Sequence, residues 1–378
     1  MHLPEDLGTI YMAGPDIGQT EIDCVVDALR NGWYGKSAYA YVESFERQFA
    51  EFHSRKYALM TPNCTTAIHL TLLGLGIGKG DQVIVPESTW IGSSAGINHA
   101  GAETVFADVE ERTWCVSTKT IEQELTSRTR AVIAVDLYGN MPDWNSLEES
   151  CERLGIPIIE DAAEALGSRY RERRAGNFGI ASVFSFHRTK TLSTGEGGMM
   201  LTDDAELFER CRFLRDHGRE PGSYFNTEVA YKYMPFNVQA ALGYGQLLRI
   251  EELIHKKRHI FETYRQSLPD DGTLQINLDN AEVFNGAWTT TVVLAKETGL
   301  TTDFLMRKMS DKGIPTRPFF YPLSSLPAYS SNHSGTTTRH PISYDLASRG
   351  IHLPCAMNLT DAQIHYVADQ LSEIIKGN

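Results

Sequence analysis

The stretch that says most about the fold is Ser182-Val-Phe-Ser185-Phe-His-Arg-Thr-Lys190-Thr-Leu-Ser-Thr-Gly195-Glu-Gly-Gly198. It predicts a buried strand ending near Ser185, then a loop with one lysine, Lys190, and a glycine-dense turn into another strand. A lysine becomes a nucleophile when it is desolvated among other cations, and His187 and Arg188 lie close to it in sequence. The alternative is an exposed lysine in a surface loop, which leaves the glycine turn behind a buried strand unexplained.

Short apolar runs separated by helical stretches extend outward from this segment. Strands that alternate with helices predict an α/β fold with a mostly parallel, seven-stranded sheet covered by helices on both faces. In such sheets ligands bind at the carboxyl ends of the strands. The predicted strands cover residues 57–60, 82–85, 103–107, 131–136, 156–161, 181–186 and 197–202.

The C-terminal third of the chain predicts a smaller α+β unit. A long helix is expected from Asn237 to about Leu268, where Pro269 follows. We expect a large domain over residues 1–250, whose first ~35 residues are free to pack on the small domain, and a small domain over 251–378. The small domain is predicted to hold a strand at 287–294, a helix at 302–312, an extended segment at 316–320, a mobile polar loop at 330–340 and a helix at 360–376.

A first candidate site follows the first predicted strand, in Pro62-Asn63-Cys64-Thr65-Thr66. The strand ends where an apolar helix begins, so free backbone N–H groups point at whatever lies before the helix. Together with the threonine hydroxyls, this arrangement suits a phosphate. The simpler interpretation is that Asn63 only caps the helix.

A second candidate site is the end of the strand Ile158-Ile-Glu-Asp161. A buried carboxylate is costly unless a cation or several donors face it, and a protonated pyridine nitrogen is such a cation. Asp161 could instead cap the next helix. Glu164 either reaches the same pocket or faces solvent.

One cofactor needs all of these pieces. Pyridoxal 5′-phosphate (PLP) requires an anion site for its phosphate, a flat residue over its ring, a carboxylate at its ring nitrogen and a lysine for its aldehyde. Trp90 follows a predicted strand and is the candidate for the flat residue. Lys190 and Asp161 are the predicted catalytic residues.

Composition narrows the class of protein. A net charge of −13 argues against a general nucleic-acid surface. The six cysteines show no C-x-x-C spacing, which favours free thiols in a reducing cytoplasm over a disulfide frame or a metal site. No apolar run approaches the roughly 20 residues that span a bilayer, and no signal peptide is evident.

The motifs together resemble the DegT/DnrJ/EryC1/StrS group of nucleotide-sugar aminotransferases. The resemblance covers nearly the whole chain, and its motifs include Gly32-Trp33, Asn63-Cys-Thr-Thr-Ala-Ile-His-Leu70, Ile159-Glu-Asp-Ala-Ala-Glu164, Ser185-Phe…Lys190…Thr194-Gly-Glu-Gly-Gly-Met199 and Gln239-Ala-Ala-Leu-Gly243. It implies fold type I, PLP bound to Lys190 as a Schiff base, and Asp161 on the ring nitrogen. It also implies a homodimer with shared active sites.

The resemblance assigns further residues. Cys64, Thr65 and Ser185 occupy phosphate-binding positions, Trp90 the stacking position, and Glu164 a position near the ring hydroxyl or the sugar. This chain has Cys64, Lys232 and Ser324 where relatives usually have Gly, Asn and His. Lys232 is expected to reach the partner's phosphate site, with Asn237 as a second candidate. Ser324 is expected to face the sugar.

The activity implied by the resemblance is ping-pong transamination. L-glutamate would supply the amino group, and a keto-sugar nucleotide similar to GDP-4-keto-6-deoxymannose would receive it, for polysaccharide, O-antigen or natural-product sugars. Related PLP-dependent sugar dehydratases carry His at the lysine position, so Lys190 favours transamination. A non-nucleotide keto sugar or cyclitol as substrate, and a non-catalytic sensor of PLP or sugar nucleotide, remain alternatives.

Overall fold

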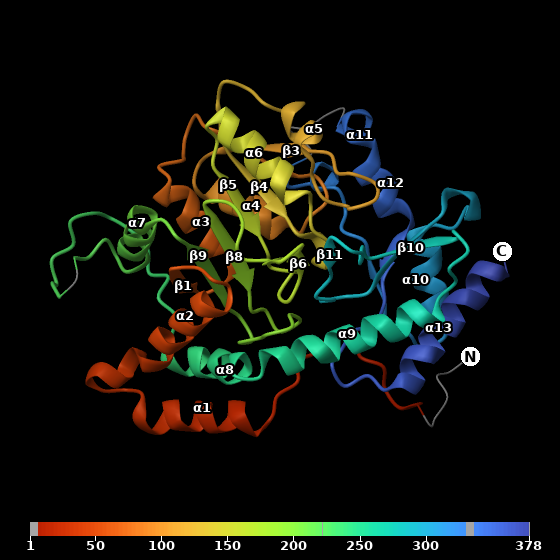
Figure 1. Cartoon of the computed structure of the whole chain (residues 1–378), viewed down its shortest axis with the longest axis horizontal. Helices are drawn as coiled ribbons and strands as arrows, with labels where there is room; N and C mark the ends of the chain where they lie inside the picture. The colour runs from red at the N-terminus through yellow and green to blue at the C-terminus, as the bar shows by residue number, and fades with distance from the viewer. Residues whose placement is uncertain (1–6, 221, 330–335, 378) are drawn as a thin grey trace.

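A seven-stranded sheet forms the centre of the larger unit in the computed structural model, which describes residues 7–220, 222–329 and 336–377 (Figure 1). The strand order is β1-β9-β8-β5-β4-β2-β3, and only the pairs that involve β9 are antiparallel. The strands are β1 (Tyr57–Thr61), β2 (Gln82–Pro86), β3 (Glu103–Ala107), β4 (Thr129–Val135), β5 (Ile158–Asp161), β8 (Ala181–Ser185) and β9 (Gly198–Thr202). The predicted mostly parallel α/β fold is therefore confirmed.

Both faces of this sheet are buried, which is why its strands read as apolar runs. In β4, Val132 and Ala134 belong to one hydrophobic cluster, whereas Ile133 and Val135 belong to the other. The first cluster includes residues of α2 (Ala40–Phe52), α6 (Trp144–Leu154) and α8 (Asn237–Leu247). The second includes residues of α3 (Cys64–Gly74), α4 (Ile91–His99) and α7 (Ala205–Arg215). Further helices are α1 (Gln19–Asn31), which packs on α8, and α5 (Thr118–Glu122).

A smaller unit has its own four-stranded sheet, in the order β10-β12-β14-β13, and its own core. Its elements are β10 (Leu274–Ile276), β12 (Thr291–Leu294), β13 (Arg317–Pro318), β14 (Gly350–His352), α10 (Thr302–Asp311), α11 (Thr336–Arg339), α12 (Pro341–Arg349) and α13 (Asp361–Lys376). Ile10 packs into this core, and the Cys355 N–H donates to Met12, so the N-terminal segment lies against the smaller unit. A three-stranded sheet combines strands from both parts of the sequence. Strands β6 (Arg169–Tyr170) and β7 (Arg173–Arg174) come from the large unit's part, and β11 (Val283–Phe284) comes from the small unit's part.

The helix predicted over 237–268 is in fact two helices, α8 and α9 (Ile250–Ser267). They are separated at Arg249, whose backbone leaves the helical region at φ −123° and ψ 27°. Its guanidinium lies 3.3 Å from Glu21, a fully buried carboxylate on α1. The break between the helices therefore coincides with the contact between Arg249 and Glu21, which are far apart in sequence. No glycine or proline stands at residues 246–250 to predict it.

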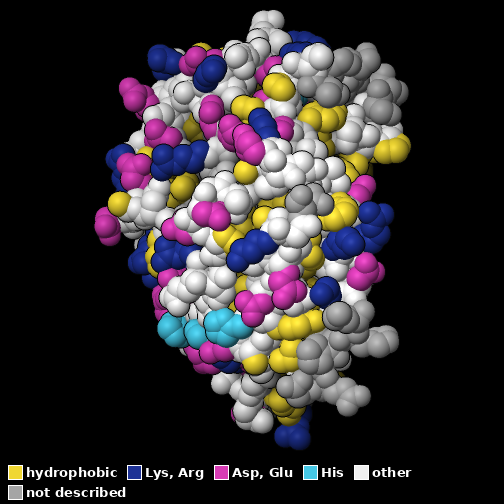
Figure 2. All heavy atoms as spheres, turned by 90° about the vertical axis from the view of Figure 1, so that its right-hand side faces the viewer, with side chains coloured by type: hydrophobic (Ala, Val, Ile, Leu, Met, Phe, Trp, Pro, Cys, Tyr) yellow, Lys and Arg dark blue, Asp and Glu magenta, His cyan; other side chains and the backbone are white. Residues whose placement is uncertain are grey.

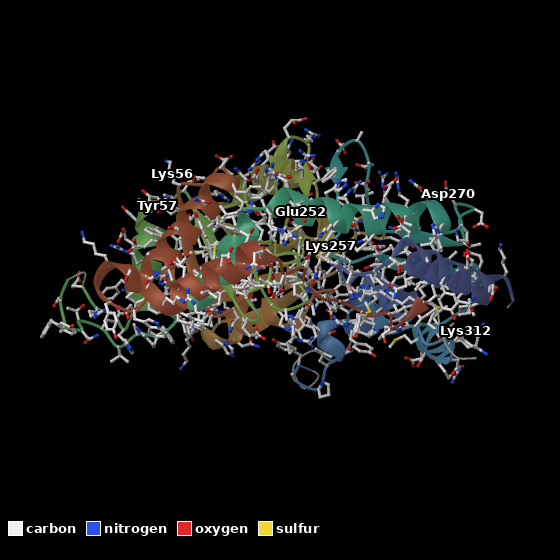
Figure 3. The ribbon with its side chains drawn as sticks, turned by 90° about the horizontal axis from the view of Figure 1, so that it is seen from below. Lys56, Tyr57, Glu252, Lys257, Asp270 and Lys312 are labelled. Atoms are coloured by element: carbon white, nitrogen blue, oxygen red, sulfur yellow. The ribbon has the colours of Figure 1, made fainter. Side chains whose placement is uncertain are left out.

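Helix α9 connects the two units, as the view from below shows (Figure 3). Its first turns place Leu253 in the core of the large unit, and its later turns place Tyr264 in the core of the small one. Lys257, in between, is buried and donates to the carbonyl oxygens of Trp288 at 3.0 Å and Cys355 at 2.6 Å. The division at residue 250, which we retain as a proposal, falls at the first turn of this helix.

Three predicted elements of the small unit differ in the structure. The strand predicted from Ala287 begins only at Thr291, because Ala287 has a left-handed backbone with φ 57°. The extended segment 316–320 contributes only the two residues of β13. Of the loop predicted over 330–340, residues 330–335 lie outside the described part, residues 336–339 form α11, and His340 is buried.

The surface of the small unit carries interspersed acidic and basic side chains on the face seen in Figure 2. One pair of this kind joins His259 of α9 to Asp361 of α13, whose atoms lie 2.7 Å apart. Among the described residues, no helix combines the length and apolar character needed to cross a bilayer.

Candidate active site

A cavity of about 610 Å³ lies at the carboxyl ends of β5 and β8. Its volume falls within the range of small-molecule sites, roughly 300–1,000 Å³. Both units contribute to its walls. Seven of the residues predicted from the sequence line it, namely Cys64, Thr65, Trp90, Asp161, Glu164, Ser185 and Lys190.

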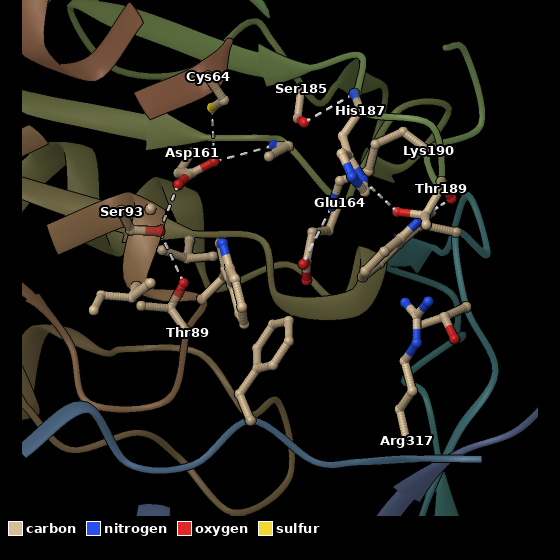
Figure 4. Close-up of a pocket in the computed structure, with 18 of the residues that line it drawn as sticks. Cys64, Thr89, Ser93, Asp161, Glu164, Ser185, His187, Thr189, Lys190 and Arg317 are labelled. Atoms are coloured by element: carbon tan, nitrogen blue, oxygen red, sulfur yellow. Dashed lines mark hydrogen bonds and ion pairs between the residues drawn. The ribbon is translucent and has the colours of Figure 1, made fainter. Parts of the chain in front are cut away.

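Asp161 is held at the end of β5 with donors on its carboxylate (Figure 4). Ser93 donates to Oδ2 at 2.7 Å, and the Ala163 N–H donates to Oδ1 at 3.1 Å. Burial raises the pKa of Asp161, while these hydrogen bonds and the Lys190 charge oppose the rise. A carboxylate buried this deeply, with its oxygens oriented by donors, is suited to a cationic partner in the cavity.

Lys190 lies within the same cavity, and its side chain is only 11% exposed. Its Nζ is 3.4 Å from Glu164 Oε1 and 3.6 Å from the centre of the Trp288 ring. The Trp288 indole is itself fixed, because it donates to the Thr189 carbonyl oxygen at 2.7 Å. The lysine is therefore a buried and oriented amine rather than a solvated surface residue.

Glu164 is buried and turned into the cavity, which resolves the two alternatives for this residue. Its Oε2 accepts the Tyr138 N–H at 2.9 Å, and Tyr138 holds a left-handed backbone with φ 56°. Burial raises the pKa of Glu164, and the Lys190 charge opposes the rise.

The start of α3 lines the same cavity, with Cys64 Sγ 3.9 Å from Asp161 Oδ1. Asn63 does cap this helix, since its side chain accepts the Thr66 N–H at 2.9 Å. Cys64 and Thr65 are the first two residues of α3, so their N–H groups have no acceptor within the helix. Gly198 lies so close that an added Cβ would stand 2.6 Å from the Cys64 nitrogen. The glycine turn after Lys190 thus lets β9 approach the helix end.

Trp90 presents a flat surface to the cavity. It stands just before α4, and 63% of it is exposed, which is unusual for such a large apolar side chain. Its ring centre lies 5.9 Å from that of Phe320, a residue of the small unit.

The remaining predicted residues lie elsewhere. Lys232 does not line this cavity; its half-exposed Nζ pairs with Asp216 at 2.8 Å, in a second hollow of the surface. Asn237 is engaged near the N-terminal helices, where its Oδ1 accepts the Tyr41 N–H at 2.9 Å. Ser324 is buried and does not line this cavity, with its Oγ 2.9 Å from the Tyr344 hydroxyl; its expected role toward the sugar stays a prediction.

Ser93, Trp288 and Arg317 are among the cavity residues that the sequence patterns do not predict. Ser93, which binds Asp161, stands three residues after Trp90 in a predictable helix start, so its position could have suggested a role. Trp288 contacts Lys190 across a long separation in sequence, and no local signal announces it. Arg317 lies in a segment whose pattern indicates only an extended backbone.

Comparisons with known proteins agree with this arrangement. Residues 15–372 match the DegT/DnrJ/EryC1/StrS aminotransferase family. The chain is 36% identical over 360 residues to the GDP-perosamine synthase of Escherichia coli O157:H7, covering 95% of this chain and 96% of that protein. The GDP-perosamine synthase of Vibrio cholerae is also 36% identical, over 94% of this chain and 96% of that protein.

Solved structures extend the likeness to the fold. The aminotransferase TlmJ from Streptoalloteichus hindustanus is 28% identical with a TM-score of 0.89, over 98% of this chain and 99% of its own. A Streptococcus pneumoniae protein in its PLP form is 26% identical with a TM-score of 0.90, over 98% of this chain and 99% of its own.

The sheet and the cavity with its lysine and buried aspartate define a PLP-dependent enzyme of fold type I. More specifically, the chain belongs to the DegT/DnrJ/EryC1/StrS aminotransferase family.

Proposed function

We propose that this enzyme transfers an amino group from L-glutamate to a keto-sugar nucleotide, with a GDP-linked 4-keto-6-deoxyhexose as the favoured acceptor. The observation that carries the proposal is the position of Lys190 and Asp161 on one cavity, with free N–H groups of α3 on the same cavity. Two relatives that match nearly the whole chain at 36% identity bear the name GDP-perosamine synthase, which supports the favoured sugar.

The residues present fit PLP. Asp161 would hold the ring nitrogen, because burial leaves this carboxylate in need of a cationic partner. Cys64, Thr65 and Ser185 would hold the phosphate at the start of α3, where free N–H groups and the helix dipole favour an anion. Trp90 would lie against the ring. When bound, PLP supplies an aldehyde that accepts amines and a ring that withdraws electrons.

Lys190 is the group that we assign to proton movement. Its Nζ would remove a proton from the donor carbon that bears the amine. In the second half-reaction it would deliver a proton to the sugar carbon that receives the amine. Glu164, 3.4 Å away, stabilises the ammonium form, and the Trp288 ring adds a cation–π contact. Both contacts act on the ammonium form and hold it inside the cavity.

We also infer a homodimer with shared active sites. Lys232 lies outside its own chain's cavity, on a surface hollow that also contains Asp216 and Arg219, from which its half-exposed side chain could reach a neighbouring chain. The free cysteines suit a reducing compartment, and we propose that the enzyme acts in the cytoplasm.

The decisive experiment is a screen of acceptors. The enzyme would first be converted to its aminated form with L-glutamate and freed of the donor. Keto sugars linked to GDP, UDP or dTDP would then be added, and the return of PLP absorbance followed. A rapid return with a GDP-linked 4-keto sugar supports the proposal. Return only with a cyclitol or an unlinked keto sugar would contradict the nucleotide part, and conversion by no donor would indicate a non-catalytic sensor.

A further inference from the structure

Arg317 places a positive charge on the cavity wall. It lines the cavity from β13 of the small unit. Within residues 7–220, 222–329 and 336–377 no carboxylate forms an ion pair with it, whereas Lys190 has Glu164. An arginine that faces a binding cavity unpaired is suited to bind an anionic ligand, because its planar group offers two parallel N–H donors to a carboxylate or phosphate.

The position of Arg317 on its sheet directs it toward the reacting centre. It lies directly opposite His352 in the antiparallel pair of β13 and β14, and residues opposite each other project from the same face. His352 also lines the cavity. In the close-up, the Arg317 guanidinium points toward the region that Lys190 and Glu164 occupy (Figure 4).

The charge state of His352, the residue opposite Arg317, bears on which ligand Arg317 can bind. Burial lowers the pKa of His352 to about 3, and the positive charges of Arg317 and Lys190 contribute to this lowering. His352 is therefore neutral near pH 7 and contributes no competing charge. Arg317, Lys190 and His352 all line the cavity.

Two ligands of the reaction carry a suitable anion: the amino donor, through its carboxylate, and the nucleotide, through its diphosphate. In an α-amino acid the carboxylate sits on the same carbon as the amine. An amine that reaches Lys190 thus brings its carboxylate close to Lys190 too. In a sugar nucleotide the pyranose ring separates the keto carbon from the diphosphate, which therefore lies farther from Lys190. Arg317 lines the same cavity as Lys190, and its guanidinium points toward the region of the lysine in Figure 4, which favours the donor.

We propose that Arg317 binds the α-carboxylate of the amino donor and so selects α-amino acids over other amines. This inference rests on the proposed transaminase function, because it assigns a residue to the donor half of that reaction.

The test separates the two half-reactions in the PLP-loaded enzyme. Arg317→Met should weaken the apparent affinity for L-glutamate by roughly tenfold or more, since a charge-assisted pair is lost. The half-reaction of the aminated enzyme with keto-sugar nucleotide should be unchanged, and PLP should remain bound. The matched control is Arg307→Met, which removes an exposed arginine of α10 that does not line the cavity.

A second donor identifies the carboxylate involved. 4-Aminobutyrate keeps the amine and the distal carboxylate of glutamate but lacks the α-carboxylate. The wild-type preference for glutamate over 4-aminobutyrate should collapse in Arg317→Met and recover in part in Arg317→Lys. An unchanged preference overturns the proposal. A defect confined to the sugar half-reaction also overturns it and assigns Arg317 to the diphosphate.

Binding without turnover keeps this test separate from the proposed function. 2-Oxoglutarate cannot aminate the PLP form, so its binding by calorimetry reports carboxylate recognition alone. Arg317→Met should weaken that binding and Arg307→Met should not; equal binding by all three proteins overturns the proposal. If the wild-type enzyme binds 2-oxoglutarate but aminates no sugar, the proposed function fails while Arg317 is still judged by this measurement. Should Arg317→Met fold poorly, Arg317→Gln removes the same charge and gives the same comparison.

Discussion

His340 Nδ1 lies 2.8 Å from Glu87 Oε2, and both side chains are almost completely buried. Glu87 Oε1 also accepts the Ser324 N–H at 2.7 Å, and its backbone oxygen accepts the Leu323 N–H at 3.0 Å. Glu87 stands three residues before Trp90 in the sequence. One buried carboxylate thus joins the Trp90 loop of the large unit to the cavity wall of the small unit, and His340 closes the network.

The first prediction concerns pH. Burial lowers the pKa of His340, but its bonds with Glu87 and Glu124 outweigh this effect and leave the pKa above its ordinary value. A raised pKa stabilises the fold fully below the unfolded value of about 6.5, and this stabilisation is lost as pH rises through the folded pKa. Melting temperature should therefore fall over that window in the wild type. His340→Gln should melt lower at pH 6 and lose this slope.

The groups that face His340 define what the experiment measures. They are Glu87 from the end of β2 and Glu124 after α5, and Arg339 pairs with Glu124 from the adjacent position. The control is His255→Gln, which removes an exposed histidine of α9. Parallel melting curves against pH for the wild type and His340→Gln would show that His340 does not carry the dependence.

The second prediction assigns the reactive lysine. Borohydride should fix PLP to Lys190, and peptide mapping should locate the label there, because this amine lies buried beside Glu164 and Trp288. Lys190→Ala should abolish turnover and keep the fold, whereas Lys79→Ala, at an exposed position, should leave both intact. Label on any other lysine would contradict the assignment.

The third prediction tests the electrostatic role of Asp161. Asp161→Asn removes the charge that would face the ring nitrogen, and a charge-assisted hydrogen bond contributes about 1.5–3 kcal/mol. PLP retention after dialysis and kcat should both fall, by roughly tenfold to a hundredfold for binding. Ser93→Ala removes only one donor on the carboxylate and should have a smaller effect. Near-normal kinetics in Asp161→Asn would mean that Asp161 only orders the Ala163 turn.

Local sequence patterns were sufficient to predict the cavity residues that lie at or just after the carboxyl ends of strands. Strand ends fall at fixed edges of a parallel sheet, so the strand pattern alone groups Asp161, Ser185 and Lys190 at one site. The patterns failed to predict features of the structure that depend on contacts between residues far apart in sequence. The break between α8 and α9 falls at Arg249, which pairs with Glu21. His340, in a segment of polar sequence, is buried against Glu87. In both cases the partner lies far away in the chain. Propensity and periodicity describe neighbours in sequence, and neither contact joins such neighbours.

The fourth prediction concerns assembly. If Lys232 completes the site of a partner chain, Lys232→Glu should fold but lose PLP affinity and activity, with sugar preference unchanged. Its ion pair with Asp216 is half exposed and contributes little to stability, so the loss should not come from unfolding. Lys56→Glu, at another surface lysine, is the control for charge reversal alone.

Mixing inactive chains then tests the shared site directly. A mixed dimer of Lys190→Ala and Lys232→Glu has one site in which both lysines are altered and one in which both are intact. Half of the dimers in an equal mixture are mixed, and each has one working site, so activity should return to about a quarter of the wild-type value. Subunit exchange must be verified with tagged chains. If exchange occurs and no activity returns, Lys232 acts within its own chain or has only a structural role, because only a site built from two chains can be restored in this way.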